Sequence, residues 1–279
     1  MLRIQTIILT CAAAALIAAP VSIIAAPSSA LLPAHFEPFI SLYDPARGGL
    51  PESQGRLRYA ALPSPIDART AFDGSGTVLT TTTDLAELAG WRIDPAQAPV
   101  LDRRVGFTLR FTLRVIEERR LPSDDNGDGL DDRAGWSVTL LASDRRGIEL
   151  GFWEDRVWAQ EGGMEPDLFT QAEGAPIDTT QSAVYALTIR GDRYALDRDG
   201  VTVLSGPLRD YTAFSGPIDP YETPNFIFLG DNTSRAGVRA RLGVVALDIG
   251  ARVMLPLIVR PAPPGAPLTG TAPIPACGR

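Results

Sequence analysis

The chain contains no lysine, one histidine and two cysteines, so arginine supplies all of its positive side-chain charge. Without lysine, Schiff-base chemistry, a phosphate-binding P-loop and a Ser-Lys mechanism are excluded. The single histidine, His35, lies in a Pro-rich stretch. Its position argues against Ser-His-Asp or Cys-His catalysis, and against a zinc site built on histidine.

Acidic residues outnumber arginines by 33 to 26, so the formal net charge is -7 at pH 7. An acidic surface argues against nucleic acid and anionic lipid as partners. If the first thirty residues are removed, Cys11 is lost and Cys277 remains alone. A single cysteine cannot form an internal disulfide, and we expect Cys277 to be a free thiol in the C-terminal tail.

Residues 1–30 have the pattern of a secretory signal peptide, with one charge at Arg3 and an apolar stretch from Ile4 to Ala19. Cleavage is expected after Ala26 or Ala30. No later apolar stretch reaches 18 residues, so we expect no transmembrane segment in the mature chain. The predicted location is extracellular or in the cell envelope.

The mature part divides by composition into three segments. Residues 31–74 and 251–279 are rich in proline, and we expect them to form an irregular N-terminal arm and an extended C-terminal tail. Between them, residues 75–250 carry a series of short alternating segments. Helical periodicity is nearly absent, apart from one short helix predicted at Thr83–Ala89.

The clearest strand pattern runs from Gly106 to Ile116, where apolar residues from Phe107 to Val115 alternate with Thr and Arg. Strict alternation predicts a strand with one buried face and one exposed face. Asp199-Gly200 gives a good hairpin signal. Further strands are predicted at Trp136–Leu140, Ile148–Phe152, Tyr185–Ile189, Tyr194–Leu196, Val201–Val203, Phe226–Leu229 and Val238–Ile249. We therefore predict an all-β, antiparallel two-sheet sandwich.

Several of these segments resemble the concanavalin A-like lectin and glucanase sandwich. The resemblance rests on Phe107–Val115, on Arg146-Gly-Ile-Glu-Leu-Gly-Phe152, and on Tyr185–Ile189 followed by Tyr194-Ala-Leu-Asp-Arg-Asp-Gly-Val. The last part is similar to laminin-G-like domains, and residues 148–228 resemble secreted bacterial domains of the choice-of-anchor type. The resemblance implies a jelly-roll fold shared by lectins, glycan hydrolases and adhesion modules. The Glu-x-Asp-x-x-Glu strand of the related β-glucanases is missing: the nearest match, Glu149 to Asp155, has Gly151 and Phe152 where carboxylates should alternate. We therefore predict no catalytic residues.

The segment Asp124-Asp125-Asn126-Gly127-Asp128-Gly129-Leu130-Asp131-Asp132 has the spacing of a calcium-binding loop. Oxygen ligands fall at alternate positions, and Gly129 suits the sharp turn at position six. A helix-flanked EF-hand is excluded because Gly135 stands where the bidentate Glu belongs. The alternative is a solvated turn between two strands. We expect a structural calcium ion; its ligands would be Asp124, Asn126, Asp128, Asp132 and the carbonyl of Leu130.

Trp153 and Trp158 flank a polar segment, and a two-residue turn at Asp155-Arg156 would make them cross-strand neighbours. A paired aromatic surface can stack on sugar rings, although aromatic residues more often serve packing. The sequence thus predicts a secreted, monomeric, non-catalytic module that binds a glycan or a cell-surface protein. The alternatives are a glycan hydrolase or lyase of the same fold, which needs two convergent carboxylates, and a structural envelope protein.

Overall fold

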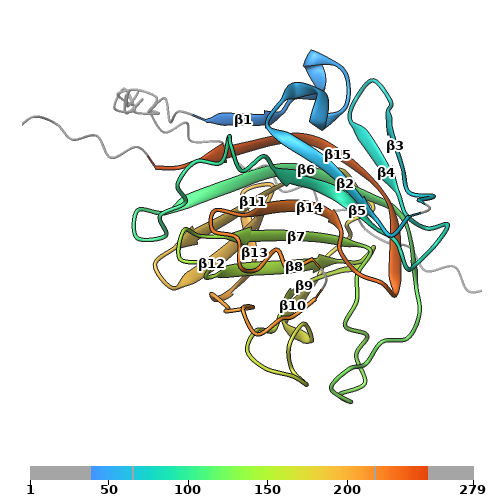
Figure 1. Ribbon diagram of the computed structural model, residues 1–279, viewed down its shortest axis with the longest axis vertical. Helices are drawn as coiled ribbons and strands as arrows, with labels where there is room; N and C mark the ends of the chain where they lie inside the picture. The colour runs from blue at the N-terminus through green and yellow to red at the C-terminus, as the bar shows by residue number, and fades with distance from the viewer. Residues whose placement is uncertain (1–38, 65, 217, 251–279) are drawn as a thin grey trace, which may run out of the picture. The chain divides into compact units, whose positions relative to one another are not determined.

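The computed structural model describes residues 39–64, 66–216 and 218–250, and Figure 1 shows that they form layered β-strands. The predicted signal peptide, the predicted tail, His35 and Cys277 lie outside these residues. Two short 3-10 helices, η1 (Pro45–Arg47) and η2 (Pro51–Gln54), precede β2. The strands are β1 (Ile40–Tyr43), β2 (Leu57–Leu62), β3 (Arg69–Phe72), β4 (Thr77–Thr80), β5 (Leu88–Ile93), β6 (Phe107–Arg120), β7 (Trp136–Leu141), β8 (Gly147–Phe152), β9 (Arg156–Gln160), β10 (Gln171–Pro176), β11 (Ala183–Arg190), β12 (Arg193–Arg198), β13 (Val201–Pro207), β14 (Ile227–Asp231) and β15 (Ala236–Asp248).

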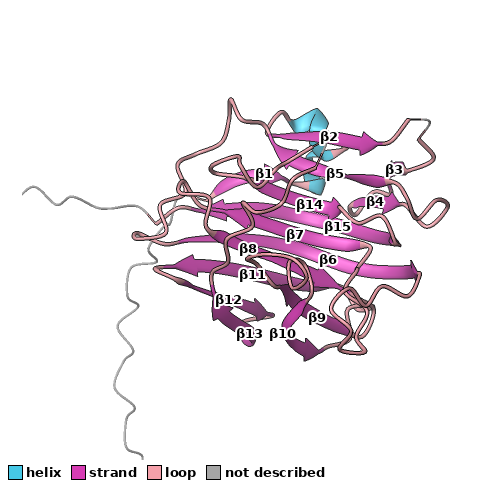
Figure 2. Cartoon of the chain, turned by 60° about the horizontal axis from the view of Figure 1, so that its bottom comes forward, coloured by secondary structure: helices cyan, strands magenta, loops and turns pink. Residues whose placement is uncertain are grey.

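The strands form two antiparallel sheets that face each other, as Figure 2 shows from a second direction. The eight-stranded sheet has the order β13-β12-β11-β6-β15-β4-β3, and β1 pairs with β15 outside this path. The seven-stranded sheet has the order β10-β9-β8-β7-β14-β5-β2. The predicted all-β, two-sheet sandwich is confirmed.

The core lies between the sheets and follows the alternation seen in the sequence. The apolar residues of β6 from Phe107 to Val115 are at most 3% exposed. Phe111 of β6 packs edge-on against Phe152 of β8, with ring centroids 6.1 Å apart, and stacks on Tyr185 of β11. Burying one such side chain contributes about 1.5–3 kcal/mol, so these contacts between the sheets are a main source of stability.

Residues 31–74, predicted to be irregular, contribute three strands to the sandwich. β1 pairs with β15, β2 pairs with β5, and β3 pairs with β4. β2 and β3 are the outermost strands of their sheets, and only Leu57 of β2 is fully buried. An edge strand with little buried surface shows weak alternation, which is why the composition of this segment concealed it.

The helix predicted at Thr83–Ala89 is absent. The Asp84 carboxylate accepts a hydrogen bond from the Ala86 N–H at 2.9 Å, which closes a turn instead of a helical repeat. The chain then enters β5 at Leu88, so the spacing of Leu85 and Leu88 reflects a turn followed by a strand. In the part of the chain that the structure describes, no helix has the length and apolar character needed to span a bilayer.

Candidate functional site

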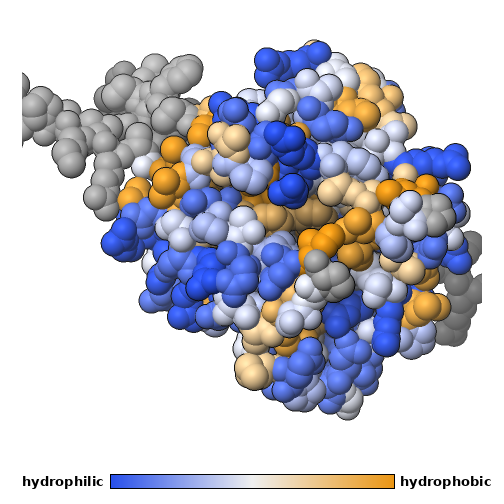
Figure 3. Space-filling view, in the orientation of Figure 1, coloured by the Kyte–Doolittle hydropathy of each residue, from blue (hydrophilic) through white to orange (hydrophobic). Residues whose placement is uncertain are grey.

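A groove of about 1020 Å³ lies on the outer face of the seven-stranded sheet. Residues that face it alternate with core residues: Trp91, Leu229, Val138 and Leu150 belong to the core, and their neighbours point outward. Figure 3 shows a hollow with apolar surface on this face, bordered by hydrophilic side chains. The groove therefore uses the sheet face that does not pack against the eight-stranded sheet.

One register row crosses the floor of the groove. Arg92 of β5 pairs with Phe228 of β14, Phe228 pairs with Thr139 of β7, and Thr139 pairs with Glu149 of β8. With strands about 4.8 Å apart, this row spans about 14 Å from Arg92 to Glu149. The floor thus carries a cation, an aromatic ring, a hydroxyl and a carboxylate in sequence across the strands.

The neighbouring register row consists of small, buried residues, which leave room for the aromatic rings that cover them. Gly90 pairs with Gly230, Gly230 with Ser137, and Ser137 with Gly151. A Cβ at Gly230 would lie 2.4 Å from the Gly90 Cα, and a Cβ at Gly90 would lie 2.6 Å from the Phe228 ring. Side chains at these two positions are therefore excluded by close approach of the strands, and the Phe228 ring lies against bare backbone.

Two long connections form one wall by folding over β8 and β9. Phe169 comes from the β9–β10 connection, and Tyr211, Phe214 and Tyr221 come from the β13–β14 connection. Phe169 stacks on Tyr211 with ring centroids 5.6 Å apart and an interplanar angle of 7°, while Tyr221 contacts both of them. This aromatic cluster is a second, smaller core that holds the wall on the sheet.

Glu149 lies at the foot of this wall and is only 3% exposed. Its Oε2 accepts hydrogen bonds from the hydroxyls of Thr139 (2.9 Å) and Tyr221 (2.7 Å), and its Oε1 accepts one from the Asn232 side-chain amide at 2.9 Å. A carboxylate offers about four acceptor positions, so one remains for a ligand. Burial, followed by the nearby Glu149 charge, raises the pKa of the Tyr221 phenol well above its usual value, which keeps it a donor.

The other charged residues of the groove differ in their partners. Asp125 pairs with Arg133 and, at 3.6 Å, with Arg235. Asp231 is fully buried; desolvation raises the pKa of its carboxyl well above the usual range, although Thr81 and Thr233 donate hydrogen bonds to it. The Arg92 side chain makes no hydrogen bond or ion pair with another described residue, although, after the hydrogen bond from Arg58, its charge contributes to lowering the pKa of Asp94.

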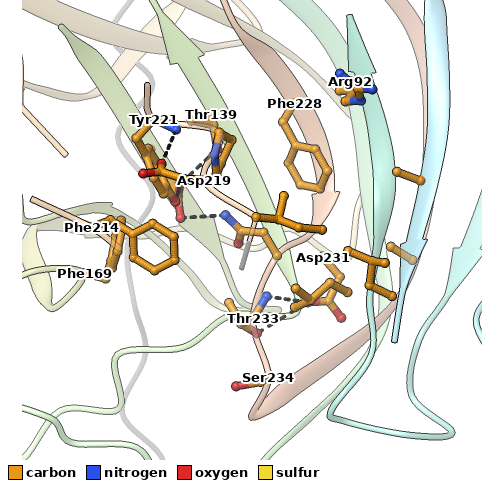
Figure 4. Close-up of a pocket in the computed structure, with 18 of the residues that line it drawn as sticks. Arg92, Thr139, Phe169, Phe214, Asp219, Tyr221, Phe228, Asp231, Thr233 and Ser234 are labelled. Atoms are coloured by element: carbon orange, nitrogen blue, oxygen red, sulfur yellow. Dashed lines mark hydrogen bonds between the residues drawn. The ribbon is translucent and has the colours of Figure 1, made fainter. Parts of the chain in front are cut away.

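Figure 4 shows how the labelled residues lie around this space. Tyr221 and Thr139 stand on one side, Arg92 stands on the other, and the Phe228 ring lies between them. Asp231 and Thr233 close one end, where dashed lines mark their hydrogen bonds. The groove can therefore present donors, acceptors and an aromatic face to one ligand.

The predicted tryptophan platform is not formed. The backbone N–H of Trp153 donates to the Arg156 carbonyl, so the turn lies at Glu154-Asp155, one residue earlier than predicted. As a result, Trp158 pairs with Gly151 instead of with Trp153. The two indoles are in contact, with ring centroids 4.6 Å apart, but Trp153 is 8% and Trp158 0% exposed. The Arg120 guanidinium covers the Trp153 ring at 3.7 Å, so no indole face is free to stack on a sugar.

The Asp124–Asp132 loop is held by its own side chains. Asp124 accepts hydrogen bonds from the N–H groups of Gly127, Asp128 and Gly129, and Asp128 accepts one from Leu130. Asn126 accepts a hydrogen bond from the Asp128 N–H.

The Asp132 carboxylate lies apart from the exposed part of this loop. It is fully buried and accepts hydrogen bonds from the N–H groups of Asp125 and Gln171. The all-oxygen donor set suits calcium chemically. Nevertheless, among residues 39–64, 66–216 and 218–250, no three acidic, histidine or cysteine side chains converge as a metal site.

Sequence reasoning identified neither Glu149 as a binding residue nor Arg92, Phe228 and Tyr221. Glu149 carried a signal, because it is a carboxylate between Ile148 and Leu150 in an apolar strand. An acid on the outer face of such a strand needs partners if it is covered. The covering residues come from the β13–β14 connection, whose path no local pattern indicates.

No family model matches the chain, and no curated protein matches it at significance. A carbohydrate esterase from the Shiga toxin-encoding bacteriophage phi24B superposes with a TM-score of 0.47 and 13% identity, covering 76% of this chain and 100% of that one. A Bacillus subtilis protein of unknown function with a galectin-like fold gives 0.44 and 11%, covering 75% and 96%. The VIP36 exoplasmic domain, bound to Ca²⁺ and Man2, gives 0.44 and 10%, covering 76% and 88%. Each of these structures is similar to this chain at a TM-score below 0.5 and an identity of at most 13%.

Proposed function

We propose that this protein is a non-catalytic module that binds a carbohydrate in the groove of the seven-stranded sheet. The observation that carries the proposal is the register row of Arg92, Phe228, Thr139 and Glu149 beneath an aromatic wall. Sugars combine apolar ring faces with hydroxyls that donate and accept hydrogen bonds. An aromatic floor with a few oriented polar groups is the usual composition of a small-ligand site.

Glu149 suits ligand binding better than catalysis. Its carboxylate is already the acceptor of three protein hydrogen bonds, which leaves one position for a sugar hydroxyl. A hydrolase would need a second carboxylate about 5 Å or about 6.5–9.5 Å away, free to act on the same bond. Asp125 pairs with Arg133 and Arg235, and burial raises the pKa of Asp231, so neither supports that role. Asp219, the other carboxylate lining the described groove, accepts the Tyr221 N–H.

The proposed setting is outside the cell, where a module of this kind would bind a glycan as a monomer. Support comes from the signal-like pattern of residues 1–30 and from the acidic composition. Two classes of outcome would change the assignment: capture of a cell-surface protein through this face, or release of reducing ends from a bound glycan. The second would indicate a hydrolase or lyase.

A glycan array tests the proposal, with wild type, Phe228→Ala and the matched control Phe72→Ala. Phe72 lies on β3 of the other sheet and is 36% exposed, so its replacement leaves the groove intact. We expect wild type and the control to bind the same glycans and Phe228→Ala to lose at least tenfold in affinity, about 1.4 kcal/mol. If wild type binds no glycan, or if all three bind alike, the proposal fails.

We also propose that calcium orders the Asp124–Asp132 loop, because Asp124 and Asp128 have no arginine partner among the described residues, whereas Asp125 and Asp131 do. With a dissociation constant on the order of 10⁻⁴ M, about 10 mM calcium would stabilise the fold by about 2.7 kcal/mol. Asp128→Asn keeps the acceptor for the Leu130 N–H and removes the charge. Calcium should raise the melting temperature of wild type but not of this variant. A wild-type melt that is the same in calcium and in EDTA would contradict the metal.

A further inference from the structure

The charged residues of the groove are distributed unevenly across its width. Glu149 lies at one end of the floor row, and Asp219, which accepts the Tyr221 N–H, lies on the same side. Arg92 lies at the opposite end, on β5. Glu149 and Arg92 therefore lie on opposite sides of the Phe228 ring, whereas Arg133, on the side of the aromatic wall, is paired with Asp125.

Arg92 is the charged lining residue that the protein leaves unpaired. Its cross-strand neighbour Arg58 forms an ion pair with Asp94 at 2.6 Å, whereas the exposed Arg92 side chain makes no hydrogen bond or ion pair with any described residue. Figure 4 shows its guanidinium beside the groove, above the Phe228 ring. A guanidinium presents a planar fork of N–H donors that matches a carboxylate.

The remaining charges do not compete for the same ligand group. The Asp125 carboxylate is neutralised by Arg133 and Arg235, and the raised pKa of Asp231 favours its uncharged form. Glu149 is enclosed by three donors about 14 Å from Arg92 along the floor. Repulsion between Glu149 and an anionic group at Arg92 is weak over this distance, which exceeds the Debye length of about 8 Å at physiological salt.

We infer that the groove selects an acidic oligosaccharide, and that Arg92 binds a uronate carboxylate while Glu149 accepts a hydrogen bond from a hydroxyl at the other end. The inference rests on the proposed carbohydrate-binding function. Because the two groups lie about 14 Å apart, the ligand must be longer than one sugar unit.

The test compares oligogalacturonate, as a representative hexuronate chain, with its methyl ester, which has the same length and hydroxyls but no charge. Affinities are measured by calorimetry for wild type, Arg92→Gln and the control Arg58→Gln, whose arginine already has a partner. We expect wild type to bind the acid about 10–100-fold more tightly than the ester, as for a charge-assisted hydrogen-bonded pair. Arg92→Gln should remove this preference, and Arg58→Gln should retain it.

Raising NaCl from about 0.05 M to about 0.5 M should weaken binding of the acid by wild type and leave the ester unaffected, because the ion pair is screened.

Equal affinity for acid and ester, or a preference that survives in Arg92→Gln, would overturn the inference. In that case Phe228→Ala still reports on the proposed function, because loss of ester binding in that variant supports a groove for neutral glycans. If neither ligand nor any glycan of the array binds, both proposals fail. Since Arg92 is exposed and unpaired, its replacement leaves the fold intact, and a thermal melt verifies this.

Discussion

The Tyr221 phenol donates a hydrogen bond to Glu149 Oε2 at 2.7 Å, although the two residues are 72 positions apart in the chain. This bond fixes the β13–β14 connection to the middle of the seven-stranded sheet. Tyr211, from the same connection, accepts the Glu149 N–H and donates to the Gln160 carbonyl. The wall of the groove is therefore attached to its floor by a buried polar network as well as by aromatic packing.

Tyr221→Phe should reduce the free energy of unfolding by about 1–2 kcal/mol, because it removes a buried donor to a carboxylate and leaves the ring packing in place. Tyr59→Phe is the matched control: its phenol is buried without a partner in the described structure, so its loss should cost nothing or stabilise slightly. Urea denaturation measures both. Equal effects of the two substitutions would mean that the Tyr221–Glu149 bond adds no stability.

The strands that the sequence predicted are those with one face in the core. The segment from Phe107 to Val115 alternates strictly because its apolar side chains fill the space between the sheets. β2 and β3 were missed because edge strands bury less surface. Thr83–Ala89 was misread because a turn reproduced helical spacing over a few residues. β5 and β9 were also missed, because these inner strands are largely buried on both faces and do not alternate. The pattern thus predicts the alternating strands well, and the edge strands and the strands without alternation poorly.

The candidate site depends on contacts that local patterns do not contain. Trp153 and Trp158 do lie together, but Arg120, from the end of β6, covers one of them. Glu149 becomes a site residue only when Tyr221 and Asn232 reach it from distant segments. Local sequence predicts which residues face outward, and the long connections decide which of these stay accessible.

Arg209, in the β13–β14 connection, forms an ion pair with Glu173 of β10, and it also pairs with Glu161 at 3.0 Å. Tyr194 of β12, in the other sheet, donates to the same Glu173 at 2.7 Å. Arg209→Met should destabilise the protein by about 2–3 kcal/mol, because Arg209 is 7% exposed and both carboxylates lose the guanidinium. Arg104→Met, at a pair whose arginine is 81% exposed, should change stability by less than about 1 kcal/mol.

The cost of Arg209→Met should also depend on pH. Burial alone would raise the pKa of Glu173, but hydrogen bonds from Arg209 and Tyr194 outweigh it and lower the pKa below the usual 4.5. A carboxyl whose pKa is lowered in the folded state stabilises the fold when the pH is above its pKa in the unfolded state. This contribution is lost as the pH falls through the pKa in the folded state. The difference in unfolding free energy between wild type and Arg209→Met should therefore shrink below about pH 4.5. A difference that is constant from pH 7 to pH 3 would exclude the ion pair as its source.

Asp231 should affect the pH dependence of stability in the direction opposite to Glu173, and Asp231→Asn should remove this effect. Burial raises the pKa of the Asp231 carboxyl far above 3.8, so the folded state favours the protonated form. The stabilisation is complete when the pH is below the pKa of this carboxyl in the unfolded state, and it is lost as the pH rises towards the pKa in the folded state. Relative to the Asn variant, wild type should lose up to about 1.4 kcal/mol per pH unit above pH 4. Parallel stability curves for the two proteins from pH 4 to pH 8 would contradict a raised pKa.

Trp158→Phe should leave carbohydrate affinity unchanged while lowering stability, which separates the buried indole pair from the groove. Trp158 lies against Gly151, where a Cβ would be 2.6 Å from the indole, and Phe fills this space incompletely. All four tryptophans are at most 8% exposed. Their fluorescence should therefore resist acrylamide quenching in the free protein, and adding glycan should not protect them further.

Phe228→Ala should show the reverse pattern, with weaker binding and a small loss of stability, because its ring lines the groove outside the main core. If Trp158→Phe abolished binding and Phe228→Ala did not, the ligand would lie over β8 and β9, beside the indole pair, instead.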